Sequence, residues 1–436
     1  MSRNPMSSAL RTEAALSCIV QDDRDIRAFV ATLPDSAERE AQASDMRHAA
    51  EQSLGPLDGV PFAVKGNIAV SGLPTQSGTN AFDIPAPADA TVVARLRAAG
   101  AVLIGTLNMH EGALGATTDN PFWGRCINPL KSGFTPGGSS GGSAAAIASG
   151  MVPLTLGTDT MGSVRIPAAY CGLWGLKPTQ GRVPVTGLTH LSWTLDTIGP
   201  LASDLRMLGA MLAAIEGPDA ADPMSVRLFP EKAELQSLQG LRFGVPDVAA
   251  LADCENVVLD AFEAFKSCLV ESGVILEPLE VLGWNPGRLR RAGLLISEVE
   301  GAIVLGDALD GSGFSDGFRA MLEFGRRAGV GKLAQAYRQV QQLAVSFDQA
   351  IAGFDGILLP TAPQRAFAHG DAVPVNQADF TALANVAGAP ALTIPLNAPD
   401  ADLPCAAQII GPKGSDYHLI EMGVLMQTFT LVRQDA

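Results

Sequence analysis

Positive charge is scarce in this sequence. Lysine and arginine together number 30, against 45 aspartates and glutamates, so the formal net charge is -15. A protein that binds nucleic acid irrespective of its sequence needs clustered lysines and arginines, and this balance therefore argues against a nucleic-acid partner. Charged residues of all kinds make up only 17% of the chain and hydrophobic residues 47%, which excludes a disordered protein and indicates a globular one.

Long apolar runs, export signals and cysteine motifs are also missing. No stretch reaches the roughly eighteen apolar residues that a membrane-spanning helix needs, so no membrane association is expected. The start, MSRNPMSSALRTEAAL, has no apolar core of the kind found in secretory signals, which favours a cytoplasmic protein. The six cysteines are scattered without a CxxC or CxxH pair, so we expect reduced thiols and no metal site.

What the sequence does contain is an alternation of helical and strand-like segments. Residues 1–54 have apolar side chains at three- and four-residue spacing, as in amphipathic helices. Residues 55–215 alternate strand-like runs, such as GVPFAVKGNIAV and AVLIGTL, with helical ones. Charged helical segments dominate 217–350, and strand-like runs, GILLPTAP and APALTIPL, return to the core in 351–436. The pattern predicts one layered α/β core with a helical insertion.

A glycine- and serine-rich stretch, TPGGSSGGSAAAIASGMVPLTLGTDTMGSVRIPAAYCG, runs from Thr135 to Gly172. Flexible linkers have a similar glycine and serine content, but this stretch contains too many apolar residues for a solvated linker. A phosphate-binding loop would need the pattern GxxxxGK[ST], and no lysine follows these glycines. The stretch therefore favours an active site at which serines are held by a permissive backbone.

The motif GGSSG around Ser139 also satisfies GxSxG, the nucleophile elbow of α/β-hydrolases. In that interpretation Ser139 is the nucleophile of an esterase, and a later histidine is its base. Three histidines follow it: His190, His369 and His418. An elbow connects a buried strand to a helix, however, and the preceding NPLKSGFTP does not resemble a strand. The esterase stays as an alternative.

A serine can also be activated by a lysine, provided that the amine is neutral. An unperturbed lysine, with a pKa of about 10.4, is almost wholly charged at neutral pH. Burial lowers this pKa because it disfavours the ammonium form. Lys65, in GVPFAVKGNIAV, has apolar neighbours and no acidic residue within six positions on either side. It is therefore a candidate for a neutral catalytic lysine.

Three stretches together resemble the amidase signature family of serine hydrolases: GVPFAVKGNI, the glycine- and serine-rich stretch continued to GLWGLKPTQGRVP, and LDTIGPLASD. The resemblance follows the family order from about Leu57 to Ile215, with weaker matches in GILLPTAP, FTALANVAGAPALTIPL and AAQIIGP. It implies a single amidase domain over 1–436, with a central mixed β-sheet flanked by helices in an α/β/α arrangement. Residues 55–215 would be the catalytic core, and 217–350 the variable region that shapes substrate access.

The resemblance also implies a Ser-cisSer-Lys triad formed by Ser163, Ser139 and Lys65. Ser163, in TMGSVRIP, would be the acylated nucleophile, and Ser139 would relay a proton between it and Lys65. The peptide bond between Gly138 and Ser139 would be cis, and the glycines around it would let the backbone fold tightly. Ser140 would support the relay through a hydrogen bond, and the alternative is a structural role as a cap or turn residue.

The same resemblance assigns an oxyanion hole to four backbone N–H groups, those of Thr160, Met161, Gly162 and Ser163. Preorganised donors of this kind stabilise the negative oxygen that forms when a nucleophile attacks a carbonyl group. Asp159 and Arg165 flank the nucleophile. For this pair a structural tie between the loop and its neighbours is favoured over anchoring of the substrate.

Three positions depart from the family pattern. Met161 stands where the family commonly has glycine, Gly66 where an aspartate often follows the lysine, and His110 where an acidic residue is frequent. A methionine beside the nucleophile would narrow the site or supply an apolar contact, and the alternative is that it only packs against its neighbours. Loss of a carboxylate next to Lys65 would remove a charge that favours the ammonium form. These departures bear on the substrate and not on the triad.

The function implied is hydrolysis of a carbon–nitrogen amide bond through an acyl-enzyme, without a metal or organic cofactor. The substrate would be a small-molecule amide with an apolar or aryl part, or a carbamate (as for a urethanase) or ester of that kind. One alternative is an amidotransferase subunit that releases ammonia from glutamine for tRNA-dependent transamidation, and another is a non-catalytic binding protein on the same scaffold. The sequence leaves the substrate and the oligomeric state open, a homodimer included.

Overall fold

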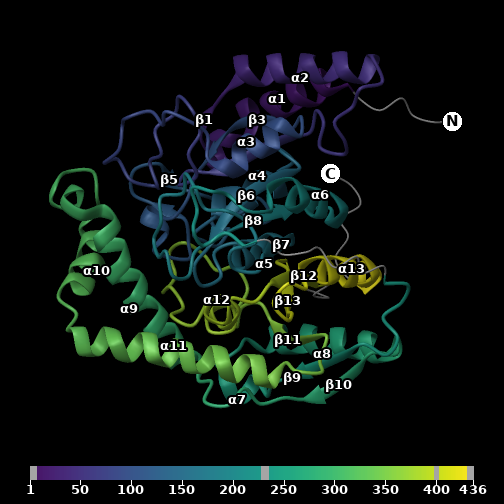
Figure 1. The fold of residues 1–436 in the computed structure, drawn as a ribbon, viewed down its shortest axis with the longest axis vertical. Helices are drawn as coiled ribbons and strands as arrows, with labels where there is room; N and C mark the ends of the chain where they lie inside the picture. Colours follow the sequence, from purple (N-terminus) through teal and green to yellow (C-terminus); the bar gives the residue numbers. More distant parts are fainter. Residues whose placement is uncertain (1–6, 227–234, 397–401, 430–436) are drawn as a thin grey trace.

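The computed structural model describes residues 7–226, 235–396 and 402–429. Its centre is a mixed sheet of eleven strands in the order β1-β3-β2-β6-β8-β7-β12-β13-β11-β9-β10 (Figure 1). Two short strands, β4 and β5, pair separately. The strands are β1 (Phe29–Thr32), β2 (Pro61–Lys65), β3 (Val102–Leu107), β4 (Asp119–Asn120), β5 (Gly124–Arg125), β6 (Leu154–Asp159), β7 (Trp174–Lys177), β8 (Thr197–Ala202), β9 (Arg242–Val245), β10 (Ile275–Pro278), β11 (Gly356–Pro360), β12 (Ala391–Leu396) and β13 (Cys405–Ile410).

Helices surround this sheet, and none in the described part of the chain is both long and apolar enough to cross a membrane. At the starts of α1, α6, α9 and α10 a polar side chain accepts unpaired backbone N–H groups, as Asp204 does for Arg206 and Met207. The helices are α1 (Ser8–Ile26), α2 (Pro34–Ala49), α3 (Thr91–Ala98), α4 (Gly141–Ala148), α5 (Arg165–Cys171), α6 (Leu205–Ile215), α7 (Val248–Leu251), α8 (Asn256–Glu271), α9 (Pro286–Leu305), α10 (Asp316–Arg326), α11 (Val330–Ala350), α12 (Ala382–Ala387) and α13 (Asp416–Met426), with the 3-10 turns η1 (Glu111–Ala113), η2 (Gly306–Asp310) and η3 (Gln427–Phe429).

The buried strands send apolar side chains to both faces of the sheet. In β2, Phe62 and Val64 belong to the largest apolar cluster, whereas Ala63 between them belongs to a second one. Because side chains alternate between faces along a strand, these two clusters lie on opposite faces. Helices α3, α6, α8 and α13 contribute to the first cluster, and α1, α2 and α4 to the second. This is the α/β/α arrangement that the sequence implied.

Most of the expected elements are present, with two differences. The helices expected near the N-terminus are α1 and α2, but the strand β1 lies between them and pairs with β3. The range 217–350 contains the long helices α9, α10 and α11, drawn in green in Figure 1, and it also contributes β9 and β10 to the edge of the sheet. A strand of four residues has too short a pattern to be distinguished from a loop by periodicity.

A buried glutamate fastens the long helices to the core. Glu300, in α9, is 1% exposed, and its carboxylate accepts the hydroxyls of Ser192 and Thr194, both at 2.5 Å, and the N–H of Thr194 at 3.1 Å. The hydroxyl of Tyr337, in α11, donates to the same carboxylate at 2.5 Å. Ser192 and Thr194 belong to residues 190–196, which precede β8 and are called the 190–196 loop below. One carboxylate therefore joins α9, α11 and this loop.

We expect Glu300→Ala to lower the free energy of unfolding by about 2 kcal/mol or more, because it leaves several buried donors without an acceptor. Urea denaturation followed by circular dichroism measures the change. Tyr337→Phe is the matched control. It removes one donor and keeps the carboxylate with its other partners, so its loss should be about 1 kcal/mol. Equal stability of Glu300→Ala and the wild type would contradict this role.

Candidate active site

The residues predicted for the site meet where two parallel strands end. Lys65 is the last residue of β2 and Asp159 the last of β6. These strands are parallel neighbours, so their C-terminal ends lie at the same edge of the sheet. Ser139 and Ser140 directly precede α4, and Ser163 lies two residues before α5. The fold thus brings segments that are far apart in the sequence to one edge.

Lys65 is fully buried and contacts only neutral hydrogen-bond partners. Its Nζ donates to Ser139 Oγ at 2.7 Å and to Thr158 Oγ1 at 2.7 Å. Burial lowers the pKa of Lys65 to about 7, although the negative charges of Asp196 and Asp159 act in the opposite direction. At this pKa a large fraction of the amine is neutral at neutral pH, as a base requires.

Ser139 follows a cis peptide bond, as the family resemblance implied. The bond between Gly138 and Ser139 is cis, and the carbonyl of Ser139 accepts the N–H of His110 at 3.0 Å. Gly138 lies against a neighbouring segment, because a Cβ at this position would be 2.8 Å from the backbone nitrogen of Thr117. A larger residue at position 138 would push these two segments apart.

Ser163 lies beside the Ser139 segment and is half-buried. Its carbonyl accepts the N–H of Ser140 at 3.3 Å, which ties the two segments together. The hydroxyl of Ser163 has no hydrogen-bond partner among the described residues. The structure therefore contains the Lys65–Ser139 contact and a backbone link to Ser163, and it leaves the Ser163 hydroxyl unengaged.

Ser140 binds the backbone of β6. Its Oγ donates to the carbonyl of Thr158 at 3.2 Å and accepts the N–H of the same residue at 3.3 Å. Thr158 is also the second partner of Lys65, so Ser140 fixes the residue that holds the amine. Ser140 thus supports the site indirectly, because it holds the backbone of Thr158 in β6 and Thr158 binds Lys65.

Asp159 and Arg165 form a fully buried ion pair. Arg165 donates to both carboxylate oxygens of Asp159, each at 3.0 Å, and its other N–H groups bind Thr381, Asn385 and Gln408. Burial alone would raise the pKa of Asp159, but the charge and hydrogen bonds of Arg165 lower it to about 2. With every donor of Arg165 engaged, the pair fits a structural tie and not an anchor for substrate.

No histidine side chain is hydrogen-bonded to the hydroxyl of Ser139 in the described structure. His190 lies 3.1 Å from Asp196, His369 Nε2 lies 2.8 Å from the carbonyl of Cys126, and His418 pairs with Asp355. Ser139 instead contacts Lys65. The geometry therefore gives no support to the esterase interpretation, in which Ser139 would need a histidine base.

Comparison with known proteins extends over almost the whole chain. A family model described as Amidase matches residues 11–420. This chain belongs to the amidase family. Among curated relatives, a subunit of the glutamyl-tRNA(Gln) amidotransferase of Chloroflexus aurantiacus is 35% identical, over 96% of this chain and 92% of the relative. The corresponding protein of a Synechococcus species, which has the same name, is 34% identical, over 98% of this chain and 93% of the relative.

Solved structures of amidases share the fold. A chain from the vestigial protein complex that reveals the evolutionary origins of an s-triazine catabolic enzyme has a TM-score of 0.90 and 32% identity, with 97% of this chain and 95% of that chain covered. The peptide amidase of Stenotrophomonas maltophilia has a TM-score of 0.85 and 29% identity, with 97% and 94% covered. These likenesses confirm the fold predicted from the sequence and the hydrolysis of amide C–N bonds as the chemistry of the family.

In this amidase the segment 160–163, called the 160–163 loop, was expected to supply four oxyanion donors. The N–H of Gly162, however, donates to Asp159 Oδ1 at 2.6 Å, so it is engaged within the protein and not free for a substrate. The N–H groups of Thr160, Met161 and Ser163 have no acceptor among the described residues. An oxyanion hole in this conformation would therefore draw on these three groups.

Met161 fills the space between the 160–163 loop and α9. It is half-buried, and a Cβ built on Gly293 of α9 would lie 2.5 Å from its sulfur. Its carbonyl accepts the hydroxyl of Thr381 at 2.6 Å. The side chain of Met161 thus packs toward α9.

Gly66 and His110, the other two positions expected to differ from the family pattern, lie close to Lys65. Gly66 follows it directly, and the imidazole of His110 is near enough for the two charges to interact. Burial lowers the pKa of His110 to about 4, against a smaller opposing effect of Asp119, and the charge of Lys65 lowers it further. The imidazole is consequently neutral at neutral pH. His110 Nδ1 lies 3.2 Å from Thr117 Oγ1, which orients the ring.

Two polar residues that the sequence analysis did not single out belong to this site. Thr158 accepts hydrogen bonds from Lys65 and, at 3.3 Å, from Asn67. Asp196 Oδ1 accepts the hydroxyl of Thr160 at 2.6 Å. In the sequence, the only sign that Thr158 has a role was its polar side chain in a strand that was expected to be buried. Asp196 lay in LDTIGPLASD, a stretch that resembles the family, but no role was assigned to it. Within residues 7–226, 235–396 and 402–429, no group of three His, Cys, Asp or Glu side chains could hold a metal ion.

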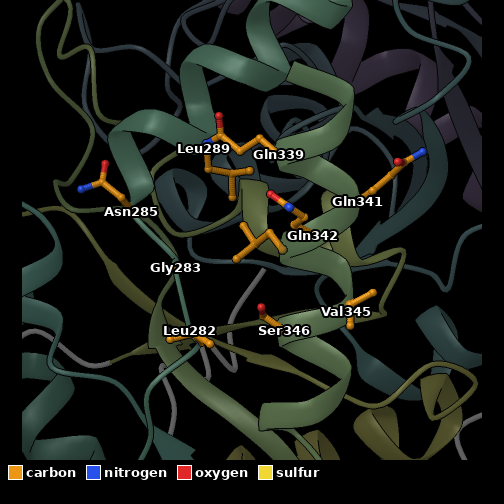
Figure 2. A pocket seen from close by; sticks show the side chains of 10 residues that line it. Leu282, Gly283, Asn285, Leu289, Gln339, Gln341, Gln342, Val345 and Ser346 are labelled. Carbon is orange, nitrogen blue, oxygen red and sulfur yellow. The ribbon is translucent and has the colours of Figure 1, made fainter. Parts of the chain in front are cut away.

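Two cavities differ in whether the residues that line them belong to the site. One of about 570 Å³ opens between α9 and α11, where Figure 2 shows Leu289 and Gln342 facing it. None of the predicted triad residues lines this cavity. Another, of about 450 Å³, is lined in part by His190, Trp193 and Asp196, so it adjoins the site through Asp196.

We expect Gly162→Ala to lower kcat by about tenfold or more, since strained backbone costs roughly 1–3 kcal/mol. Gly162 has a φ of +133°, and a Cβ there would lie 2.3 Å from Thr381 Oγ1, so the 160–163 loop would have to move. Steady-state kinetics on an activated anilide measures the effect. Gly150→Ala is the control: Gly150 has a φ of +76° but no atom within 4 Å of the added methyl. Equal kcat values for the two variants would show that the loop tolerates the change.

Proposed function

We propose that this amidase hydrolyses a small amide through an acyl-enzyme formed on Ser163. The oxygen of Ser163 attacks the carbonyl carbon of the substrate while its proton passes to Ser139, which gives its own proton to neutral Lys65. The carbonyl oxygen becomes negative in this step. The free N–H groups of Thr160, Met161 and Ser163 are the proposed donors that stabilise it.

The amine leaves in the second half of acylation. The C–N bond breaks, and the proton held by Lys65 returns through Ser139 to the departing nitrogen. A water molecule then gives a proton to the same relay while its oxygen attacks the ester on Ser163. The acid is released, and the proton returns to Ser163, so the enzyme is unchanged after each turnover.

The 2.7 Å contact between Lys65 Nζ and Ser139 Oγ is the observation that supports this mechanism most strongly. A lysine with a pKa of about 7 can accept a proton at neutral pH. At neutral pH an ordinary lysine, with a pKa of about 10.4, is in its neutral form in fewer than about one molecule in a thousand. Burial thus supplies the base that a Ser-Ser-Lys relay requires.

We expect a fluorophosphonate to label Ser163, and Lys65→Met to slow the labelling by about a thousandfold or more, because the relay loses its base. Ser163→Ala should abolish the adduct. Intact-mass and peptide mass spectrometry measure rate and position. Lys413→Met, which removes an exposed lysine, is the matched control and should label at the wild-type rate.

A triple replacement of His190, His369 and His418 by alanine tests the esterase alternative. The Ser-Ser-Lys relay predicts that this variant still labels on Ser163. An adduct on Ser139 that disappears with the histidines would instead assign the nucleophile to Ser139 and overturn the proposed mechanism.

Two observations support two substrate classes. Met161, two positions before Ser163, has an apolar side chain, and Arg165 has no free donor. Both features favour an uncharged amide with an apolar or aryl part, or a carbamate. The curated relatives, at 34% to 36% identity, are named as subunits of an amidotransferase, and this favours release of ammonia from glutamine within a complex as a second candidate.

The purified chain alone distinguishes these candidates. We expect it to hydrolyse anilides or aryl carbamates without tRNA or another protein, with a kcat/KM at least about tenfold above that for glutamine, which corresponds to about 1.4 kcal/mol of preference. Release of amine, acid and ammonia is measured by chromatography. Inactivity on all small amides, combined with glutamine hydrolysis that appears only when partner proteins and tRNA are added, would support the amidotransferase instead.

A further inference from the structure

Asp196 joins the 190–196 loop to the 160–163 loop. Its side chain is 7% exposed, and its Oδ1 accepts the hydroxyl of Thr160 at 2.6 Å. Thr160 is the first residue of the segment whose N–H groups are the proposed oxyanion donors. A short hydrogen bond to a carboxylate is among the stronger ones in proteins, so it restrains the start of this segment.

The second oxygen of Asp196 is held by its own loop. Oδ2 accepts the N–H groups of Leu191 and Ser192 at 2.9 and 3.1 Å, and it lies 3.1 Å from Nδ1 of His190. Ser192 is in turn bound to Glu300 of α9. The Asp196 carboxylate is therefore held by its own loop, and that loop is held by α9 through Glu300.

The charge of Asp196 also acts on Lys65. It raises the pKa of Lys65 more than Asp159 does, and Asp159 is paired with Arg165. The imidazole of His110, which is neutral at neutral pH, also lies close enough to interact with the amine, and His190 contacts Asp196. Asp196 is accordingly the main negative charge that a protonated Lys65 would experience.

We propose that Asp196 is a positioning residue for the hydrolysis assigned above, an inference that rests on the proposed function. It orients Thr160, and through it the N–H groups of the 160–163 loop, toward the forming oxyanion. Its charge stabilises the ammonium form of Lys65 that arises when Ser163 loses its proton. Geometry and charge are two separable contributions of the same carboxylate.

Three variants separate these contributions. Asp196→Asn keeps the shape and removes the charge, and Thr160→Val keeps the charge and removes the hydrogen bond. Asp222→Asn is the matched control, because Asp222 lines the same cavity and accepts the N–H of Val185 without contacting the 160–163 loop. The rate constant for fluorophosphonate labelling and the kcat for a p-nitroanilide are measured across the pH range, with circular dichroism to verify folding.

In the wild type the rate should rise with pH through a midpoint near 7, because the neutral amine of Lys65 is the active form. Loss of a nearby negative charge lowers the pKa of a lysine, so Asp196→Asn should move this midpoint down by about one unit. It should also lower the plateau of kcat by about tenfold or more. Thr160→Val should lower the plateau by a similar factor and leave the midpoint in place, and Asp222→Asn should change neither.

The outcomes are distinguishable. A Ser163 adduct in the wild type, together with an Asp196→Asn profile that matches Asp222→Asn in midpoint and plateau, would overturn the inference and leave the proposed function standing. A plateau for Thr160→Val equal to that of the wild type would overturn the geometric part. A wild type that forms no adduct on Ser163 would overturn the proposed function, and this inference with it.

Discussion

An amine that is buried at the edge of a sheet, with only neutral hydroxyl groups in contact, holds a proton weakly. Lys65 is in this position: two hydroxyls accept its hydrogen bonds, and no carboxylate touches it. Burial is the largest influence on its pKa. A direct ion pair would restore the ordinary basicity of the lysine and remove the base. The arrangement of the surrounding charges follows from this constraint.

Asp159 shows how the fold partly offsets a negative charge near this amine. It is the last residue of β6, one position after the threonine that holds Lys65, and it is fully buried. Arg165 contacts both of its oxygens. The positive charge of Arg165 partly offsets that of the carboxylate, and Asp159 raises the pKa of Lys65 less than Asp196 does. The same pair also fixes the 160–163 loop, since Asp159 accepts the N–H of Gly162.

The 160–163 loop is held from three directions, and each belongs to a different part of the chain. Asp196 binds Thr160 from the 190–196 loop, Thr381 binds the carbonyl of Met161, and α9 packs on the side chain of Met161 at Gly293. The long helices therefore contact the site in two ways, through Gly293 and through Glu300. Relatives with the same fold carry the names of a peptide amidase and of an amidotransferase subunit.

The sequence by itself determined the order of helices and strands, the family, and the residue types and positions of Lys65, Ser139 and Ser163. These were readable because strand periodicity and glycine-rich turns are local properties of the backbone, and because the matched stretches stand in a fixed order. The strands β1, β9 and β10 were too short for their periodicity to be recognised. Only the tertiary structure decided that Gly162 is engaged by Asp159, that Thr158 holds the amine, and that Asp196 reaches Thr160. Threonine and aspartate occur throughout the chain, and a partner such as Thr158, 93 positions from Lys65, is selected by strand register and loop packing and not by any local pattern.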